Sequence, residues 1–258
     1  MRNLIVVCAL FFLPLSVFGH DDLRNRADAA WQDRDDQAKA EQALELYRKL
    51  AEQHPDSIDL RIREARAAYW VIEVDEIRSA VYDTERMDKD EQAAFANQGI
   101  AACREVLSRD SENHRAHYWL IWNMAARTLA QGLFSGFAFK DSIMGTIMVS
   151  KADHSYQYGG IYRYWARIIH YMPGLLGRFF HFTEKDAVRF YKQAIGIQPN
   201  YLRSHFWLAE TYEELDMPGK AKEEYRFCVD FPEGSLPEVA PENKLYRLWA
   251  KKRLEERF

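Results

Sequence analysis

The feature that most constrains the fold is an order of small and aromatic residues that returns along the chain at a fixed distance. The first copy consists of Ala187, Tyr191, Ala194 and Pro199, and the second of Ala221, Tyr225, Cys228 and Pro232. The offset between the two copies is 34 residues. Steps of three and four residues place side chains on one face of a helix, and proline cannot continue a helix. The pattern therefore predicts two similar helices, each ended by a proline.

A 34-residue period with this order of residues is typical of tetratricopeptide repeats, in which each unit is a pair of helices. The small residues let neighbouring helices approach, and the aromatic residue fills the space beside them. Two earlier copies are Ala43, Tyr47, Leu50 and Pro55, and, in degenerate form, Gly99, Cys103, Val106 and Ser111. Strand signals are nearly absent. The sequence predicts an all-α fold of tetratricopeptide-like stacked helical hairpins, an α-solenoid whose concave surface is the usual binding face.

The repeats are unequally spaced, which indicates additions between them. The markers at 43, 99, 187 and 221 are separated by 56, 88 and 34 residues. The first interval is longer than the 34-residue period, which predicts a longer helix pair around 63–83. The second predicts a helical, aromatic-rich insertion at about 131–182, where twelve of 52 residues are aromatic. The last segment, about 242–257, reads as a capping helix with Leu245, Leu248 and Trp249 facing inward. We predict a single domain over 20–258.

The N-terminus carries a targeting signal. Arg2 is followed by a largely apolar run from Leu4 to Phe18, and Gly19 is small enough for a cleavage site. This order is typical of a secretory signal peptide over 1–19, with retention as an uncleaved anchor as the alternative. Cys8 lies inside the apolar run, too early for a lipid-attachment site. We expect an exported, periplasmic protein.

Composition and motifs exclude several function classes. A net charge of -4, with acidic and basic residues interspersed, argues against a nucleic-acid binder. His114 and His117 lack a third ligand at a sensible spacing, and no nucleophile elbow or phosphate loop occurs. Cys103 and Cys228 fall at helical packing positions, which predicts two separate buried thiols. We expect no enzyme activity, no metal and no cofactor.

The segment YQYGGIYRYWARIIHYMPG, residues 156–174, is the most unusual stretch of the insertion. Gly159 and Gly160 permit close backbone approach and leave free N–H groups at a helix start, where an anion is favoured. Arg163 and Arg167 are one helical turn apart, and arginine suits a carboxylate. The candidate ligand-binding or channel-lining residues are Tyr158, Gly159, Gly160, Tyr162, Arg163, Trp165 and Arg167. The alternative is that the aromatic side chains form core and that the arginines pair with acidic residues of neighbouring helices.

The order of AHYWLIWNMAART, the hydrophobic insertion, YGGIYRYWARIIHYMPG, LGR and QPNYLRSHFWLAETY resembles the T-component family of TRAP transporters over residues 112–231. The main mark is Gly-Gly-x-x-Arg, which starts at Gly159 and is followed about a dozen residues later by Pro-Gly. The chain departs from the family at Ile161, where a proline is common, and in lacking a lipidation site.

The resemblance implies a non-enzymatic periplasmic scaffold that associates with the solute-binding P-component of a TRAP transporter. It also implies a homotrimer whose protomers each hold or pass a small hydrophobic or carboxylate ligand through a channel. By position, Gly159, Gly160, Tyr162 and Arg163 would belong to the family motif. The alternative function is a generic tetratricopeptide adaptor for envelope assembly that binds a peptide or partner protein in its concave face.

Overall fold

The structure is a computed structural model that describes residues 17–131, 154–171, 181–232 and 234–258. All regular structure within these ranges is helical, which confirms the predicted all-α class. The α-helices are α1 (Val17–Gln32), α2 (Gln37–Gln53), α3 (Ile58–Tyr82), α4 (Lys89–Arg109), α5 (His114–Gln131), α7 (Tyr156–Tyr171), α9 (Glu184–Ile197), α10 (Leu202–Glu214), α11 (Pro218–Asp230) and α12 (Ala240–Arg257). A short 3-10 helix, η1 (Pro237–Val239), precedes α12.

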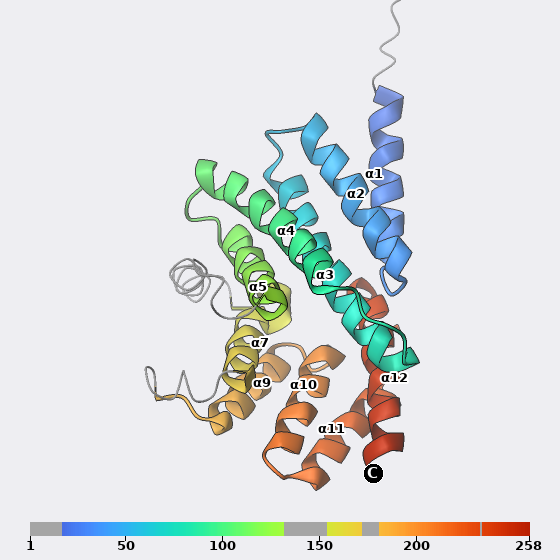
Figure 1. Cartoon of the computed structure of the whole chain (residues 1–258), viewed down its shortest axis with the longest axis vertical. Helices are drawn as coiled ribbons and strands as arrows, with labels where there is room; N and C mark the ends of the chain where they lie inside the picture. The colour runs from blue at the N-terminus through green and yellow to red at the C-terminus, as the bar shows by residue number, and fades with distance from the viewer. Residues whose placement is uncertain (1–16, 132–153, 172–180, 233) are drawn as a thin grey trace, which may run out of the picture.

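Helices that follow one another in the chain pack side by side, from α1 to α5 and again from α7 to α12 (Figure 1). The repeat markers face the core of this stack. The fully buried markers are Ala43, Tyr47, Leu50, Cys103, Ala187, Tyr191, Ala194, Ala221, Tyr225 and Cys228. Helices α2, α9 and α11 each end two residues before the proline of their repeat. The predicted solenoid of helical hairpins is confirmed, and both cysteines are buried free thiols as expected.

Local sequence signals set where several helices begin. The Asp36 carboxylate accepts a hydrogen bond from the Lys39 backbone N–H at 3.2 Å, which caps α2. Asp88 caps α4 in the same way. Thr183 precedes α9, and its N–H donates to the Asp186 carboxylate at 2.8 Å, which forms a capping box at the start of this helix. Such caps satisfy N–H groups that have no partner inside the helix, and each stabilises the protein by about 1 kcal/mol.

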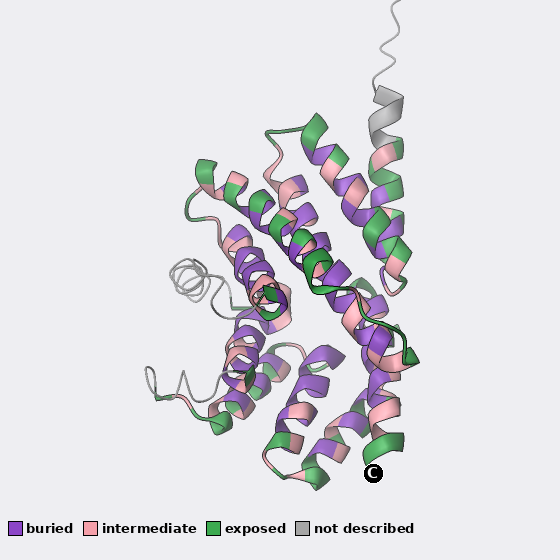
Figure 2. Cartoon of the chain, viewed as in Figure 1, coloured by how far each residue is buried: buried purple, intermediate pink, exposed green. Residues whose placement is uncertain are grey.

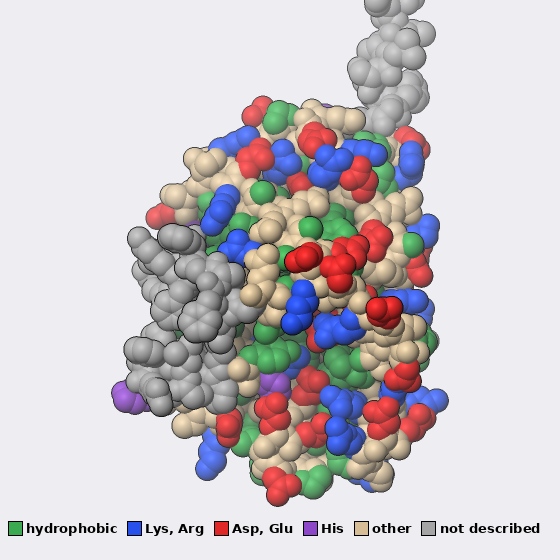
Figure 3. All heavy atoms as spheres, in the orientation of Figure 1, with side chains coloured by type: hydrophobic (Ala, Val, Ile, Leu, Met, Phe, Trp, Pro, Cys, Tyr) green, Lys and Arg blue, Asp and Glu red, His purple; other side chains and the backbone are tan. Residues whose placement is uncertain are grey.

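The long helix pair expected around 63–83 is present, since α3 has 25 residues and α4 has 21. Figure 2 shows α3 mostly buried, with exposed positions concentrated on the outer helices and helix ends. Acidic and basic side chains alternate over the face seen in Figure 3, as the interspersed charges of the sequence predicted.

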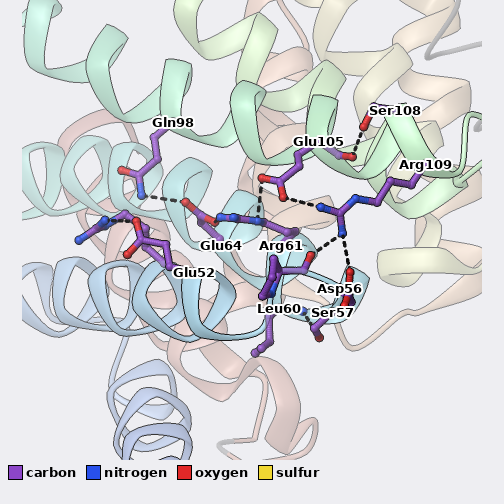
Figure 4. A network of polar contacts seen from close by, with 12 residues as sticks. Glu52, Asp56, Ser57, Leu60, Arg61, Glu64, Gln98, Glu105, Ser108 and Arg109 are labelled. Atoms are coloured by element: carbon purple, nitrogen blue, oxygen red, sulfur yellow. Dashed lines mark hydrogen bonds and ion pairs between the residues drawn. The ribbon is translucent and has the colours of Figure 1, made fainter.

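A polar network ties α3 to α4 on the outside of this pair (Figure 4). The Arg61 guanidinium lies 2.9 Å from Glu64 within α3 and 2.9 Å from Glu105 of α4. Glu105 also pairs with Arg109 at 3.0 Å, and Gln98 donates to Glu64 at 3.2 Å. The Glu105–Arg109 pair is partly exposed, and such pairs contribute about 0–1 kcal/mol. Glu64 is buried, so Arg61 supplies it with the partner that a buried carboxylate requires.

The two halves of the stack close on each other, because α12 packs against α3 as well as against α10 and α11. A buried ion pair joins them: Arg203 of α10 donates to the Glu73 carboxylate of α3. Tyr246 of α12 donates to the same carboxylate at 2.5 Å, and Arg203 donates to Tyr69 at 2.7 Å. Side chains of α10 and α12 thus meet α3 at one buried carboxylate.

Helix α7 belongs to the main stack, although it lies in the predicted insertion. It packs along α9, and four of its residues join the same continuous core as the repeats: Ile161, Tyr164, Ala166 and Ile169. The aromatic content of this segment therefore contributes to one shared core.

Parts of the predictions fall outside the described residues: the apolar leader up to Ser16, and residues 132–153 and 172–180 of the predicted insertion. Cleavage after Gly19 stays a prediction. No helix in the described part of the chain is both long enough and apolar enough to cross a bilayer.

Replacing Gly160 by Ala should destabilise the protein. A Cβ atom at Gly160 would lie 2.4–2.7 Å from the buried ring and hydroxyl of Tyr118, so that ring must move. We expect a loss of about 1–3 kcal/mol, the usual cost of overpacking a core, measured by urea unfolding. Gly196→Ala is the matched control: Gly196 lies in α9 with open space around it, and alanine there should stabilise by roughly 0.5–1 kcal/mol. Equal effects of both substitutions would contradict the packing at Gly160.

Replacing Glu73 by Gln should destabilise the protein strongly, because Arg203 would then be buried without a counter-charge. Breaking a buried ion pair typically costs about 3–5 kcal/mol. Glu76→Gln serves as the control on the same helix, since Glu76 is 36% exposed and lies 3.7 Å from Arg86; its loss should cost about 0–1 kcal/mol. Chemical denaturation of both variants measures the difference, and a Glu73→Gln effect below that of Glu76→Gln would refute the closing role of this pair.

Candidate functional site

The Gly-Gly segment forms a left-handed turn ahead of the main part of α7. Gln157, Tyr158 and Gly159 have φ values of 50°, 58° and 77°, so the regular helix begins after them. Gly159 lies close to the backbone of Ala194 in α9, and Gly160 lies against the Tyr118 ring of α5. The two glycines thus let α7 approach two neighbouring helices.

The side chain of Arg163 forms hydrogen bonds with the backbone of this turn. Its guanidinium donates to the carbonyl oxygens of Tyr158, at 2.5 Å, and of Gln157, and lies 4.5 Å from the centre of the Tyr201 ring. The side chain is 1% exposed. Two carbonyls that a left-handed turn leaves without helical partners are therefore satisfied by a buried cation.

The other candidate residues point in different directions. Arg167 pairs with Glu210 of α10 at 2.7 Å, which is the arrangement that the alternative interpretation of the arginines describes. Tyr162 and Trp165 stack on Phe190 of α9, with ring centres 6.3 and 6.5 Å apart. The structure does not bring the seven candidates together around one space; Tyr158 is the one whose side chain lines a cavity described below.

That cavity lies where the two halves of the stack meet. Its volume is about 70 Å³, and it is lined by side chains from the end of α1, from α3, α5 and α10, from the turn before α7 and from η1 and α12. Aromatic rings form much of the wall: Trp31, Tyr69, Trp70, Trp119, Tyr158 and Tyr201. Burial raises the pKa of Tyr158 and Tyr69, so these phenols stay neutral at physiological pH.

Charged side chains complete the wall. Arg34, 1% exposed, donates to Glu242 of α12 at 3.1 Å and to the Glu238 carbonyl at 2.7 Å. Tyr201 donates to the second oxygen of the Glu242 carboxylate. Arg203 also lines the cavity, and its pairing with Glu73 raises its pKa against the effect of burial. Glu242 of α12 therefore connects the α1–α2 turn, through Arg34, to the start of α10, through Tyr201. The pair of Glu73 and Arg203 lies beside it and connects α3 to α10.

Arg66 of α3 faces the same cavity, and its guanidinium lies 4.1 Å from the centre of the Trp31 ring. Trp70, one turn along α3, donates its indole N–H to the Arg34 carbonyl at 2.8 Å. Aromatic and cationic side chains from α1 and α3 thus alternate along one side of the cavity.

The sequence-based prediction missed Arg34, Arg66, Arg203 and Glu242, which lie far from the aromatic insertion. One signal was available. In REARAAYWVIE and QPNYLRSHFWLAE, single charged residues occur at positions that helical periodicity assigns to an apolar face. A charge at such a position must be paired or must serve a ligand, because burying it alone is costly.

A larger open groove lies nearby on the surface. Its volume is about 290 Å³, and its walls combine apolar residues of the α11–α12 connection with polar groups of the α1–α2 turn. The apolar residues are Phe231, Pro232, Leu236, Pro237, Ala240 and Pro241.

Two solved structures of MamA align with this chain over most of its length. One, described as the crystal structure of MamA protein, is 11% identical, with a TM-score of 0.43 over 93% of this chain and 96% of that chain. The other, described as the crystal structure of MamA, is 12% identical, with a TM-score of 0.44 over 90% of this chain and 98% of that chain. At this similarity no residue of one chain can be equated with a residue of the other. No curated protein matches the sequence.

A family model matches nearly the whole described chain. It is described as regulator of microtubule dynamics protein 1-3, and the match extends over residues 23–248. The matched range includes every described helix from α2 to α11 and the first half of α12. The chain therefore belongs to the regulator of microtubule dynamics protein 1-3 family.

Proposed function

We propose that this chain is a non-enzymatic helical scaffold that holds a small ligand between its two halves. The observation that carries the proposal is the cavity at the meeting of α1, α3, α5, α10 and α12. Small-molecule sites are typically concave, largely aromatic or apolar, and equipped with a few convergent polar groups. The cavity has this composition, and it occupies the place where an open solenoid would bind a peptide.

The family description supports a scaffold role. It names regulators of microtubule dynamics, and regulation of this kind is compatible with a protein that acts through contacts with other molecules. A ligand held between the halves would stabilise their closure, because anything that binds the folded state alone raises its stability.

Partner binding on the outside is a second candidate function, favoured by the open groove between the α1–α2 turn and η1. This groove offers apolar walls together with Asp35, Lys244 and Arg247. This groove is a described surface to which the adaptor interpretation of the sequence can be applied.

Association with the solute-binding P-component of a TRAP transporter, the homotrimer and the periplasmic location stay predictions from the sequence resemblance. Gel filtration with light scattering of residues 20–258 tests the oligomeric part: a trimer is expected if the resemblance holds, and a monomer would contradict it.

Filling the cavity should prevent ligand retention. Val239 of η1 lines the cavity and is 4% exposed, so Val239→Phe places a ring where the ligand would lie. We expect a small molecule to be released on denaturation of the wild-type protein, purified without dialysis, and to be absent from the variant. Native and denaturing mass spectrometry measure this difference.

Val229→Phe in α11 is the matched control, because Val229 is partly buried against the core and does not line the cavity. The Val229→Phe variant should retain the same bound small molecule as the wild-type protein. Equal retention by wild type and Val239→Phe would place any bound molecule elsewhere and contradict the proposed function.

A further inference from the structure

The cavity contains more positive charge than the nearby buried carboxylates balance. In the described residues, the guanidinium groups on or directly behind its wall are those of Arg34, Arg66, Arg163 and Arg203. The buried carboxylates that face them are Glu73 and Glu242. Glu238 lies at the rim with an exposed side chain. Buried charges are normally paired, so this excess calls for an anion.

The excess is concentrated on Arg66. Arg34 is matched by Glu242, Arg203 by Glu73, and Arg163 by two backbone carbonyls. Arg66 has no hydrogen-bond or ion-pair partner within the described part of the chain, and the residue as a whole is partly buried. Its Nε is buried without a partner, as are those of Arg163 and Arg203. Its contact is with the face of Trp31. Burial and the charge of Arg34 lower the pKa of Arg66, which reflects the absence of a nearby acid.

The size of the cavity limits what the anion can be. A volume of about 70 Å³ is about half that of an engineered cavity of about 150 Å³ that binds benzene, which leaves room for a group of about three or four non-hydrogen atoms. The planar fork of arginine matches a carboxylate, with which it forms two parallel hydrogen bonds. The rings of Trp31, Trp70 and Trp119 offer an apolar surface for a short carbon chain.

We propose that the cavity binds the carboxylate of a short organic acid, with Arg66 as its receptor and the aromatic wall around its alkyl part. This inference rests on the proposed function, since it names the chemical class of the ligand held there. The anion would lie with Arg66 of α3 on one side and α10 and α12 on the other, and therefore between the two halves of the chain.

The test uses formate and acetate, with formamide and acetamide as neutral probes of similar shape. Thermal unfolding of the ligand-depleted wild type is followed at constant ionic strength while chloride is replaced by each carboxylate. We expect a saturable rise of the melting temperature with the carboxylates and none with the amides. Equal rises with amides and carboxylates would overturn the proposal.

Arg66→Met should weaken acetate binding by roughly tenfold or more, the usual effect of losing charged hydrogen bonds. It should leave the ligand-free melting temperature unchanged or higher, because it removes a partly buried charge that has no acidic partner in the described residues. A merely structural arginine would instead lower that temperature. Arg66→Lys should restore part of the acetate effect, since it returns the charge without the fork.

The matched control is Arg78→Met on the same helix. Arg78 is buried to a similar degree and lies 5.2 Å from the centre of the Tyr82 ring, but it points away from the cavity and donates to the Asp35 carbonyl. Acetate should stabilise this variant as it does the wild type. Unchanged acetate affinity in folded Arg66→Met would refute the assignment of Arg66.

Failure of this inference is distinguishable from failure of the proposed function. If amides bind as well as carboxylates and Val239→Phe abolishes both, the cavity holds a ligand whose charge is irrelevant, and only the chemical class is wrong. If carboxylates stabilise wild type and Val239→Phe equally, the cavity is not the site and both proposals fall.

Discussion

The closed shape of this protein depends on the buried pair between Glu73 and Arg203. A stack of helical hairpins contains contacts between neighbours only, and such a stack leaves its inner face to solvent or to a partner. Here one carboxylate of α3 receives hydrogen bonds from both α10 and α12, so helices more than a hundred residues apart in sequence are joined. Because both charges are desolvated, the pair tolerates little displacement, and it fixes how the two halves face each other.

The helical repeats could be predicted from the sequence because they rest on local chemistry. The order Ala187, Tyr191, Ala194 determines which face of α9 is buried, and the prolines and the Thr183 capping box determine where helices begin and end. These signals act within a few residues, and the 34-residue period repeats them. The length of α3 could also be predicted, because the interval between the first two repeat copies is longer than the 34-residue period.

The closure and the cavity could not be predicted in this way, because they depend on side chains that meet across the stack. Nothing near Arg203 in the sequence indicates Glu73 as its partner, and nothing near Arg34 indicates Glu242. The aromatic segment around Gly159 attracted attention through its composition, yet in the structure its glycines serve close packing and Arg163 satisfies turn carbonyls. The composition of the sequence drew attention to the aromatic segment around Gly159. The charge that has no acidic partner in the described residues lies instead on Arg66 of α3, a helix whose composition is ordinary.

The packing of α12 on α3 also bears on how the protein unfolds. Open repeat arrays can lose terminal units one at a time, since each unit contacts only its neighbours. In this chain the last helix is anchored to the second hairpin, so fraying from the C-terminus must also break contacts near the N-terminus. The terminal helix therefore couples the C-terminal repeats to the N-terminal ones, so that the array should unfold as one cooperative unit.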